Sequence, residues 1–189
     1  MKNKKLLATI IIFTIISGSL FYFVLEQIAD QTEDIVELPL DSFSLTISDF
    51  PEGYIKSYEN DTTQGEITGL IERYEAGFIK NTNESVSNSN INYISFTISK
   101  FESIDSAKSG YPLLIDTFIT LNSTFLEDYY DTIGDESAVA YYEDMSIFIV
   151  FFRIKNILVV LVSQDDSGEF YVSSTLDYAK IIENRINAA

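Results

Sequence analysis

Cysteine, histidine and tryptophan are all missing from this sequence of 189 residues. Without cysteine the chain has no disulfide, no thiol nucleophile and no thiolate metal site. Without histidine it has no imidazole base for a catalytic triad, no histidine ligand for zinc and no side chain that titrates near neutral pH by default. We therefore expect no enzymatic activity, no cofactor and no resident metal ion. A carboxylate-based hydrolase is the remaining enzymatic alternative, but no acidic pair is distinctive in a chain with 29 acidic residues.

Basic residues are scarce, because 12 Lys and Arg face 29 Asp and Glu and give a net charge of −17. Three of the lysines precede residue 6 and every acidic residue follows residue 25, so the part beyond residue 25 has 9 basic residues and a charge of −20. This charge repels nucleic acid and anionic lipid. It is compatible with cationic partners, but we favour the simpler interpretation of a solvated acidic surface.

A run without charged residues extends from Leu6 to Leu25. At about 1.5 Å per residue, a helix of this length spans roughly 30 Å, the thickness of the hydrocarbon core of a bilayer. Lysines precede the run and acidic residues follow it. The positive-inside rule therefore predicts residues 1–5 in the cytoplasm and the rest of the chain outside. The sequence predicts a single-pass protein of the cell membrane that contacts lipid through residues 6–25.

A cleaved signal peptide is the alternative interpretation, since its basic start and apolar run follow the same pattern. The small residues at positions 17–19 offer a cleavage site. The apolar stretch continues after them to Leu25, however, so that cleavage there leaves an apolar new N-terminus. We favour an uncleaved anchor, and cleavage would instead give a secreted protein. The absence of cysteine excludes a lipoprotein.

The remaining chain divides into a short acidic stalk, residues 26–41, and one extracytoplasmic globular domain, residues 42–189. Pro39 ends any helix that continues from the membrane into the stalk. The domain is long enough to bury an ordinary hydrophobic core.

Hydrophobic periodicity predicts an α+β domain, an antiparallel β-sheet with two main helices packed on it. Tight turns between the last strands require antiparallel pairing, and we expect both main helices to cover one face of the sheet. The predicted strands are 54–58, 74–80, 91–101, 138–142, 146–154 and 157–163, and the predicted helices are a short one at 65–73 and the two main ones at 103–121 and 175–187.

Four segments together resemble the small membrane-tethered extracytoplasmic domains of prokaryotes, which include sensor domains of some receptor kinases and folds of the Mog1/PsbP type. The segments are residues 48–54 (SDFPEGY), 101–107 (FESIDSA), 133–137 (IGDES) and 152–160 (FRIKNILVV). The resemblance implies an antiparallel sheet flanked by helices, with a ligand-binding or sensory role. It carries no catalytic signature and transfers no functional residue.

Tyrosines at four positions suggest a ligand groove, because tyrosine is common in binding surfaces. They are Tyr129, Tyr130, Tyr141 and Tyr142. Arg153 lies in an otherwise apolar strand. It is either an anion-binding residue of such a groove or a residue at the strand end that reaches solvent or pairs with an acidic neighbour, and we favour the second interpretation.

Three N-x-Ser/Thr triplets are candidate glycosylation sites in predicted loops or at a helix end: Asn60, Asn83 and Asn122. Two acidic clusters are weak candidates for Ca²⁺, because neither has the regular ligand spacing of a calcium loop. These clusters are Asp128, Asp131, Asp135 and Glu136, and Asp165, Asp166 and Glu169.

Two functions fit these observations. The first is a non-catalytic binding or sensory domain outside the membrane, acting with a partner in the membrane or envelope because residues 1–5 are too short to signal alone. The second is a structural component of the cell envelope or an adhesion component.

Overall fold

The computed structural model describes residues 35–62, 68–81, 91–119, 124–125, 132–142, 146–165 and 172–189. They belong to one compact unit that begins at Ile35. The predicted cytoplasmic end, the predicted anchor and most of the predicted stalk lie outside the described residues. No helix within the described residues is long and apolar enough to cross a membrane.

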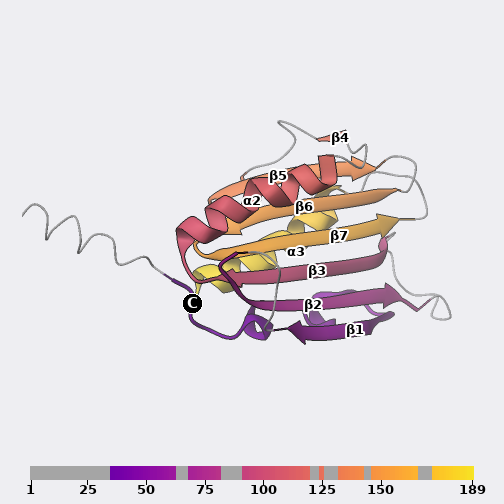
Figure 1. Ribbon diagram of the computed structural model, residues 1–189. Helices are drawn as coiled ribbons and strands as arrows, with labels where there is room; N and C mark the ends of the chain where they lie inside the picture. The colour runs from indigo at the N-terminus through magenta and orange to yellow at the C-terminus, as the bar shows by residue number, and fades with distance from the viewer. Residues whose placement is uncertain are drawn as a thin grey trace, which may run out of the picture. The chain divides into compact units, whose positions relative to one another are not determined.

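In the described part of the chain, seven strands form one antiparallel sheet with the order β1-β2-β3-β7-β6-β5-β4 (Figure 1). The strands are β1 (Tyr54–Thr62), β2 (Leu70–Lys80), β3 (Ile91–Phe101), β4 (Thr124–Phe125), β5 (Glu136–Tyr142), β6 (Ile147–Ile154) and β7 (Ile157–Asp165). The helices are α2 (Ile104–Ile119) and α3 (Val172–Asn187), together with the 3-10 helices η1 (Leu40–Phe43) and η2 (Ile47–Asp49).

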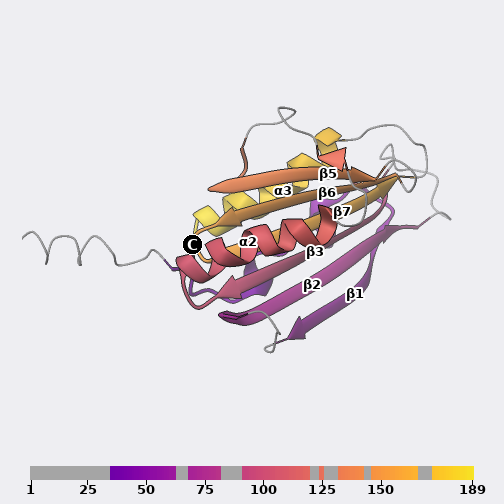
Figure 2. The ribbon, with the colours of Figure 1, turned by 45° about the horizontal axis from the view of Figure 1, so that its top comes forward.

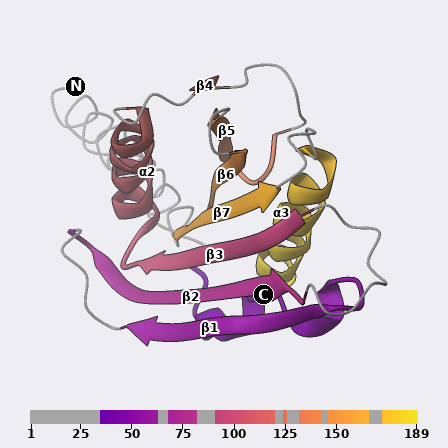
Figure 3. The same ribbon diagram turned by 90° about the vertical axis from the view of Figure 1, so that its right-hand side faces the viewer.

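The sheet separates two hydrophobic cores. One helix packs in each core, because α2 and α3 lie on opposite sides of the sheet (Figure 3). Strand β6 shows why, because its successive side chains alternate between the two cores. Phe148, Val150 and Phe152 lie in the core on the α3 side, while Ile149 and Phe151 lie in the core on the α2 side. The expectation that both helices cover one face is therefore wrong. A strand that is apolar at every position needs a cover on both faces.

Most of the predicted elements are found, and the clearest error concerns the short helix expected at residues 65–73. Residues 70–73 belong to β2, which starts directly after a turn at Gly69 with φ +80°. Strand β3 extends far enough to pair with this part of the chain, so cross-strand pairing overrides the local preference for a helix. Helix α2 continues through Pro112.

The N-terminal segment, residues 35–50, packs against the sheet on the α3 side. Its apolar side chains are buried in that core: Val36, Leu40, Phe43, Leu45 and Phe50. Residues 35–41 therefore belong to the folded domain and not to the predicted stalk. Spaced apolar residues in an acidic stretch look the same whether they line a stalk or fill a core.

Asn156, in the turn between β6 and β7, joins the start of this segment to the sheet. Its side chain is fully buried. The Val36 N–H donates to Asn156 Oδ1 at 2.8 Å, and Asn156 Nδ2 donates to the Phe101 carbonyl at 2.8 Å. One amide side chain thus satisfies two backbone groups, one from the N-terminal segment and one from the end of β3.

A buried ion pair holds the segment a few residues further on. Lys100 Nζ lies 2.6 Å from Glu72 Oε2, and the lysine side chain is only 9% exposed. Lys100 Nζ also donates to the Leu38 carbonyl at 3.0 Å, while Glu72 Oε1 accepts the Leu40 N–H at 3.4 Å. Each charge therefore has a second, backbone partner, which offsets part of the cost of removing the pair from water.

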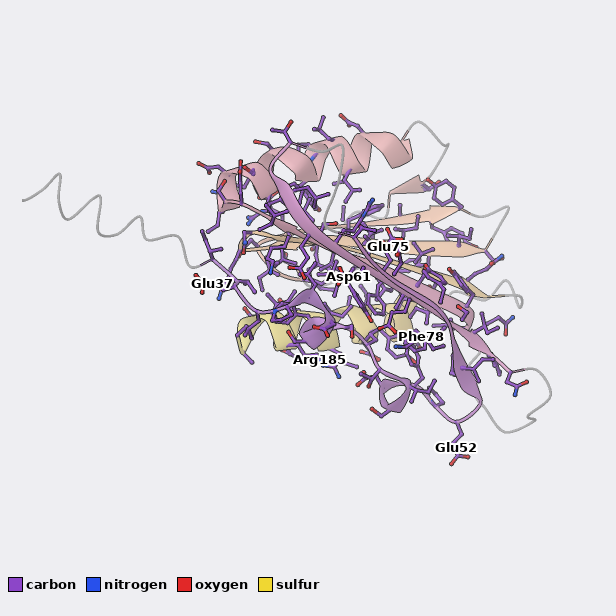
Figure 4. All side chains as sticks on the ribbon, turned by 60° about the horizontal axis from the view of Figure 1, so that its bottom comes forward. Glu37, Glu52, Asp61, Glu75, Phe78 and Arg185 are labelled. Carbon is purple, nitrogen blue, oxygen red and sulfur yellow. The ribbon has the colours of Figure 1, made fainter. Side chains whose placement is uncertain are left out.

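The end of the segment is held by Arg185 of α3 (Figure 4). Its guanidinium donates to the Ser44 carbonyl and, from Nη2, to both Asp49 oxygens at 2.8 and 3.0 Å. Partial burial raises the pKa of Asp49. Hydrogen bonds from the Thr46 N–H and from Arg185 outweigh that effect and hold the pKa below its ordinary value of 3.8.

Replacing Asn156 tests whether its two hydrogen bonds secure the N-terminal segment. We expect N156A to lower the free energy of unfolding of the full-length chain by about 2–4 kcal/mol, because two buried backbone groups lose their partner. Chemical denaturation in detergent micelles measures the change. N187A, at an exposed position in the last turn of α3, is the control and should stay within about 0.5 kcal/mol. A loss below about 1 kcal/mol for N156A contradicts the assignment.

The Arg185–Asp49 pair predicts a pH-dependent contribution to stability. A carboxyl whose folded pKa is lowered contributes stability above its unfolded pKa and loses it as the pH falls through the folded value. The wild type should exceed D49N by about 1–2 kcal/mol near pH 7, and this difference should shrink as the pH falls below about 4. Unfolding curves across this pH range give the difference, with D61N as the control for removal of an exposed charge. A difference that stays constant down to acid pH is the contrary result.

Candidate functional site

The proposed tyrosine groove is not assembled by the described residues. Tyr129 and Tyr130 lie outside them. Tyr141 and Tyr142 are successive residues of β5 and point to opposite faces, since Tyr141 packs in the core on the α3 side and Tyr142 in the core on the α2 side. Adjacent residues of a strand point to opposite faces and cannot line the same surface.

Arg153 is bound within the domain. Its side chain is 4% exposed. Nη1 donates to Asp135 Oδ2 at 2.8 Å and to the Lys155 carbonyl at 2.9 Å, while Nε and Nη2 donate to Glu136 Oε1 at 3.1 and 3.0 Å. This geometry matches the favoured interpretation, in which the arginine pairs with acidic neighbours at the end of a strand. Every nitrogen of the guanidinium is engaged, so Arg153 does not face an external anion.

The other candidate residues are also dispersed. Asn60, expected in a loop, lies in strand β1 with an exposed side chain, whereas Asn83 and Asn122 lie outside the described residues. Two members of the first acidic cluster are the partners of Arg153. The rest lie outside the described residues, apart from Asp165 at the end of β7. Within the described part of the chain, no group of three or more acidic side chains is placed to hold a metal ion.

The structure points to a different surface, on the α2 side of strands β1, β2 and β3. Helix α2 packs on β3, β6 and β7. In Figure 2, β1 and β2 extend beyond it, and no described helix lies over them on this side. Strand β1 is also an edge of the sheet. On this side, β1 and β2 are therefore not covered by a helix of the described residues, and β3 lies between them and α2.

We call this surface the open face and define it by the strand register. Residues directly opposite one another in paired strands point to the same side of a sheet. The open face consists of four rows that cross β1, β2 and β3: Ile55–Ile79–Tyr93, Tyr58–Gly77–Ser95, Asn60–Glu75–Thr97 and Thr62–Arg73–Ser99. The β7 partners of Ser95, Thr97 and Ser99 pack in the core on the α2 side, which places the rows on that side.

The open face is apolar at one end and polar at the other, and it has no net charge. Ile55, Ile79 and Tyr58 are 47%, 37% and 42% exposed. Two charged residues complete the polar end, and they neutralise each other, since Arg73 Nε lies 3.2 Å from Glu75 Oε1. A neutral face of this kind stands out in a chain whose net charge is −17.

Gly77 and Tyr58 shape the middle of the open face. A Cβ on residue 77 would lie 2.2 Å from Tyr58 Cε1, so the tyrosine ring occupies the space directly above the glycine. The ring crosses β2, and its hydroxyl shares hydrogen bonds with Tyr93 and Ser95 of β3. Burial raises the pKa of Tyr58 to about 12, together with the hydrogen bond to Tyr93. The ring is thereby held across three strands.

The sequence contained a partial signal for this surface. Ser95, Thr97 and Ser99 alternate with buried residues in β3, a pattern typical of a strand with one solvent-facing side. Nothing in the sequence shows that Ile55 and Ile79 lie side by side, because that depends on the register of β1 against β2.

Comparison with known proteins supports the fold and does not extend to a family. No family model matches the chain, and no curated protein matches it. One solved structure, the extracellular domain of PknH from Mycobacterium tuberculosis, superposes with a TM-score of 0.58 and 10% sequence identity, covering 83% of this chain and 100% of that domain. The described domain therefore shares the fold of the extracellular domain of PknH, which agrees with the expected resemblance at the level of fold.

Replacing Gly77 tests the arrangement of the open face. G77A should displace the Tyr58 ring, break its hydrogen bonds to β3 and lower the free energy of unfolding by about 1 kcal/mol. In a Y58A background, the same replacement should be neutral or stabilising by up to about 1 kcal/mol, because alanine costs less conformational entropy than glycine in a strand. A double-mutant cycle by chemical denaturation measures this coupling. Additive effects of the two replacements contradict the arrangement.

Proposed function

We propose that this protein is a single-pass membrane protein whose extracytoplasmic domain is a non-catalytic binding or sensory module. The observation that carries the proposal is the open face: a partly exposed surface without net charge, with apolar and hydroxyl side chains, in a chain that is strongly acidic. Exposed surfaces that combine apolar and polar side chains in this way are typical of interaction sites.

Two further observations support the proposal. The fold is that of an extracellular domain, as the superposition on the PknH domain indicates. The uncharged run at residues 6–25, with lysines before it and acidic residues after it, favours a membrane anchor with the domain outside. A binding module also fits a sequence without histidine or cysteine, because recognition does not need a nucleophile or a proton shuttle.

Single cysteines test the location and the binding role together, since the native chain has none. I55C places a thiol on the open face, and I47C places one on η2, where the isoleucine is 49% exposed on the α3 side. Intact cells are treated with a membrane-impermeant maleimide that carries a benzophenone and are then irradiated. We expect both variants to be labelled without permeabilisation, and I55C alone to give a photo-crosslinked adduct, detected by mobility shift and mass spectrometry.

The contrary outcomes are distinct from one another. Labelling that requires permeabilisation shows that the domain is not outside. Labelling of both variants with no adduct from either removes the binding role. Equal adducts from both variants show that contacts are nonspecific and do not depend on the open face.

A further inference from the structure

We propose that the open face binds a neutral oligosaccharide, laid along strands β1, β2 and β3. The proposal rests on the proposed binding role and adds to it the chemistry of the ligand. It follows from three properties of the described residues: the charge of the face, the chemistry of its rows and its size.

Charge excludes the ionic ligands. An anionic ligand meets repulsion from a chain with 29 acidic and 12 basic residues. A cationic ligand is not expected to prefer the open face. The single carboxylate of that face, Glu75, is already paired with Arg73, and carboxylates are frequent elsewhere in the chain. A neutral ligand covers the Arg73–Glu75 pair without separating it, and so leaves no buried charge without a partner.

The rows match the two surfaces of a sugar ring. A pyranose presents apolar C–H groups on its faces and hydroxyl groups at its rim. Ile55, Ile79 and the ring of Tyr58 offer an apolar platform on which the C–H face of a sugar ring can pack. Hydroxyl groups of the neighbouring rows both donate and accept hydrogen bonds, as sugar hydroxyls do. Ser95 and Thr97 provide these groups on β3, beside the phenol of Tyr58.

The platform is also held in place before any ligand arrives. The Tyr58 ring lies over Gly77 and is hydrogen-bonded to two side chains of β3. A ring that is already ordered loses little rotamer freedom on binding, so more of the interaction energy appears as affinity. A sheet surface is likewise a more rigid support than a loop.

Size favours an extended oligomer over a second copy of the chain or a folded protein. Four rows two residues apart and three strands about 4.8 Å apart give roughly 20 by 10 Å between the outermost Cα atoms. The rectangle between these Cα atoms has an area of about 200 Å², well below the ~800 Å² that each partner buries in a standard protein–protein interface. A strip of these dimensions accommodates a few consecutive sugar rings.

The test uses the full-length chain in detergent micelles and titrates it by calorimetry with hexamers of neutral sugars: cellohexaose, maltohexaose, xylohexaose, mannohexaose and N-acetylchitohexaose. Hexaglucosamine, the deacetylated and cationic form of N-acetylchitohexaose, is the matched charged probe. We expect at least one neutral hexamer to bind at micromolar to millimolar concentration with little dependence on salt. Y58A and I79T should each weaken this binding at least tenfold, whereas I47T, exposed on the α3 side, should leave it unchanged.

Two results overturn the proposal. The first is no binding by any neutral hexamer, including the case in which hexaglucosamine alone binds and is released by added salt. The second is binding that Y58A and I79T leave unchanged. A polypeptide crosslinked to I55C in intact cells, with no binding by any neutral hexamer, leaves the proposed function in place and overturns only the oligosaccharide. Folding of each variant is checked by its denaturation midpoint, and I55T provides a second, independent change on the same face if Y58A unfolds.

Discussion

The burial of the central strands on both faces is the constraint from which the rest of the domain follows. Strands β3, β7 and β6 place apolar side chains in both cores, so the sheet needs a cover on each side. A helix is about 10 Å wide and strands are about 4.8 Å apart, so one helix covers only two or three strands. On the α3 side the N-terminal segment extends the cover over β1 and β2. On the α2 side no described segment does so, and the open face remains.

Much of the sheet could be predicted from the sequence, because the period of two is strong where strands are long. The strand at residues 91–101 is found with the same bounds, and the hairpin around Lys155 and Asn156 forms where two apolar runs meet. The placement of the helices could not be predicted in the same way. Continuous apolar runs such as residues 147–152 indicate that both faces of a strand are buried, which disagrees with the expectation that both helices cover one face.

The site was less accessible to sequence reasoning than the fold. Tyr141 and Tyr142 are adjacent in the sequence and face opposite cores, while Ile55 and Ile79 are distant in the sequence and lie side by side. Register and cross-strand pairing decide both cases, and neither leaves a trace in composition. The net charge of −17 predicts an acidic surface, but it does not show how the charges are distributed. The strand register places Arg73 and Glu75 together on the open face, where their charges cancel.

The two hydrogen bonds of the Asn156 side chain have a mechanical consequence. Ile35 and the C-terminus lie at the same end of the domain, beside the turn between β6 and β7 (Figure 1). A pull on the backbone at Ile35 is therefore carried first by the Val36–Asn156 hydrogen bond and next by the contacts of Lys100 and Glu72. These bonds connect to β2, to β3 and to the turn between β6 and β7, and not to the edge strand β1. Tension at Ile35 therefore enters the sheet through β2 and β3, two of the three strands that carry the open face.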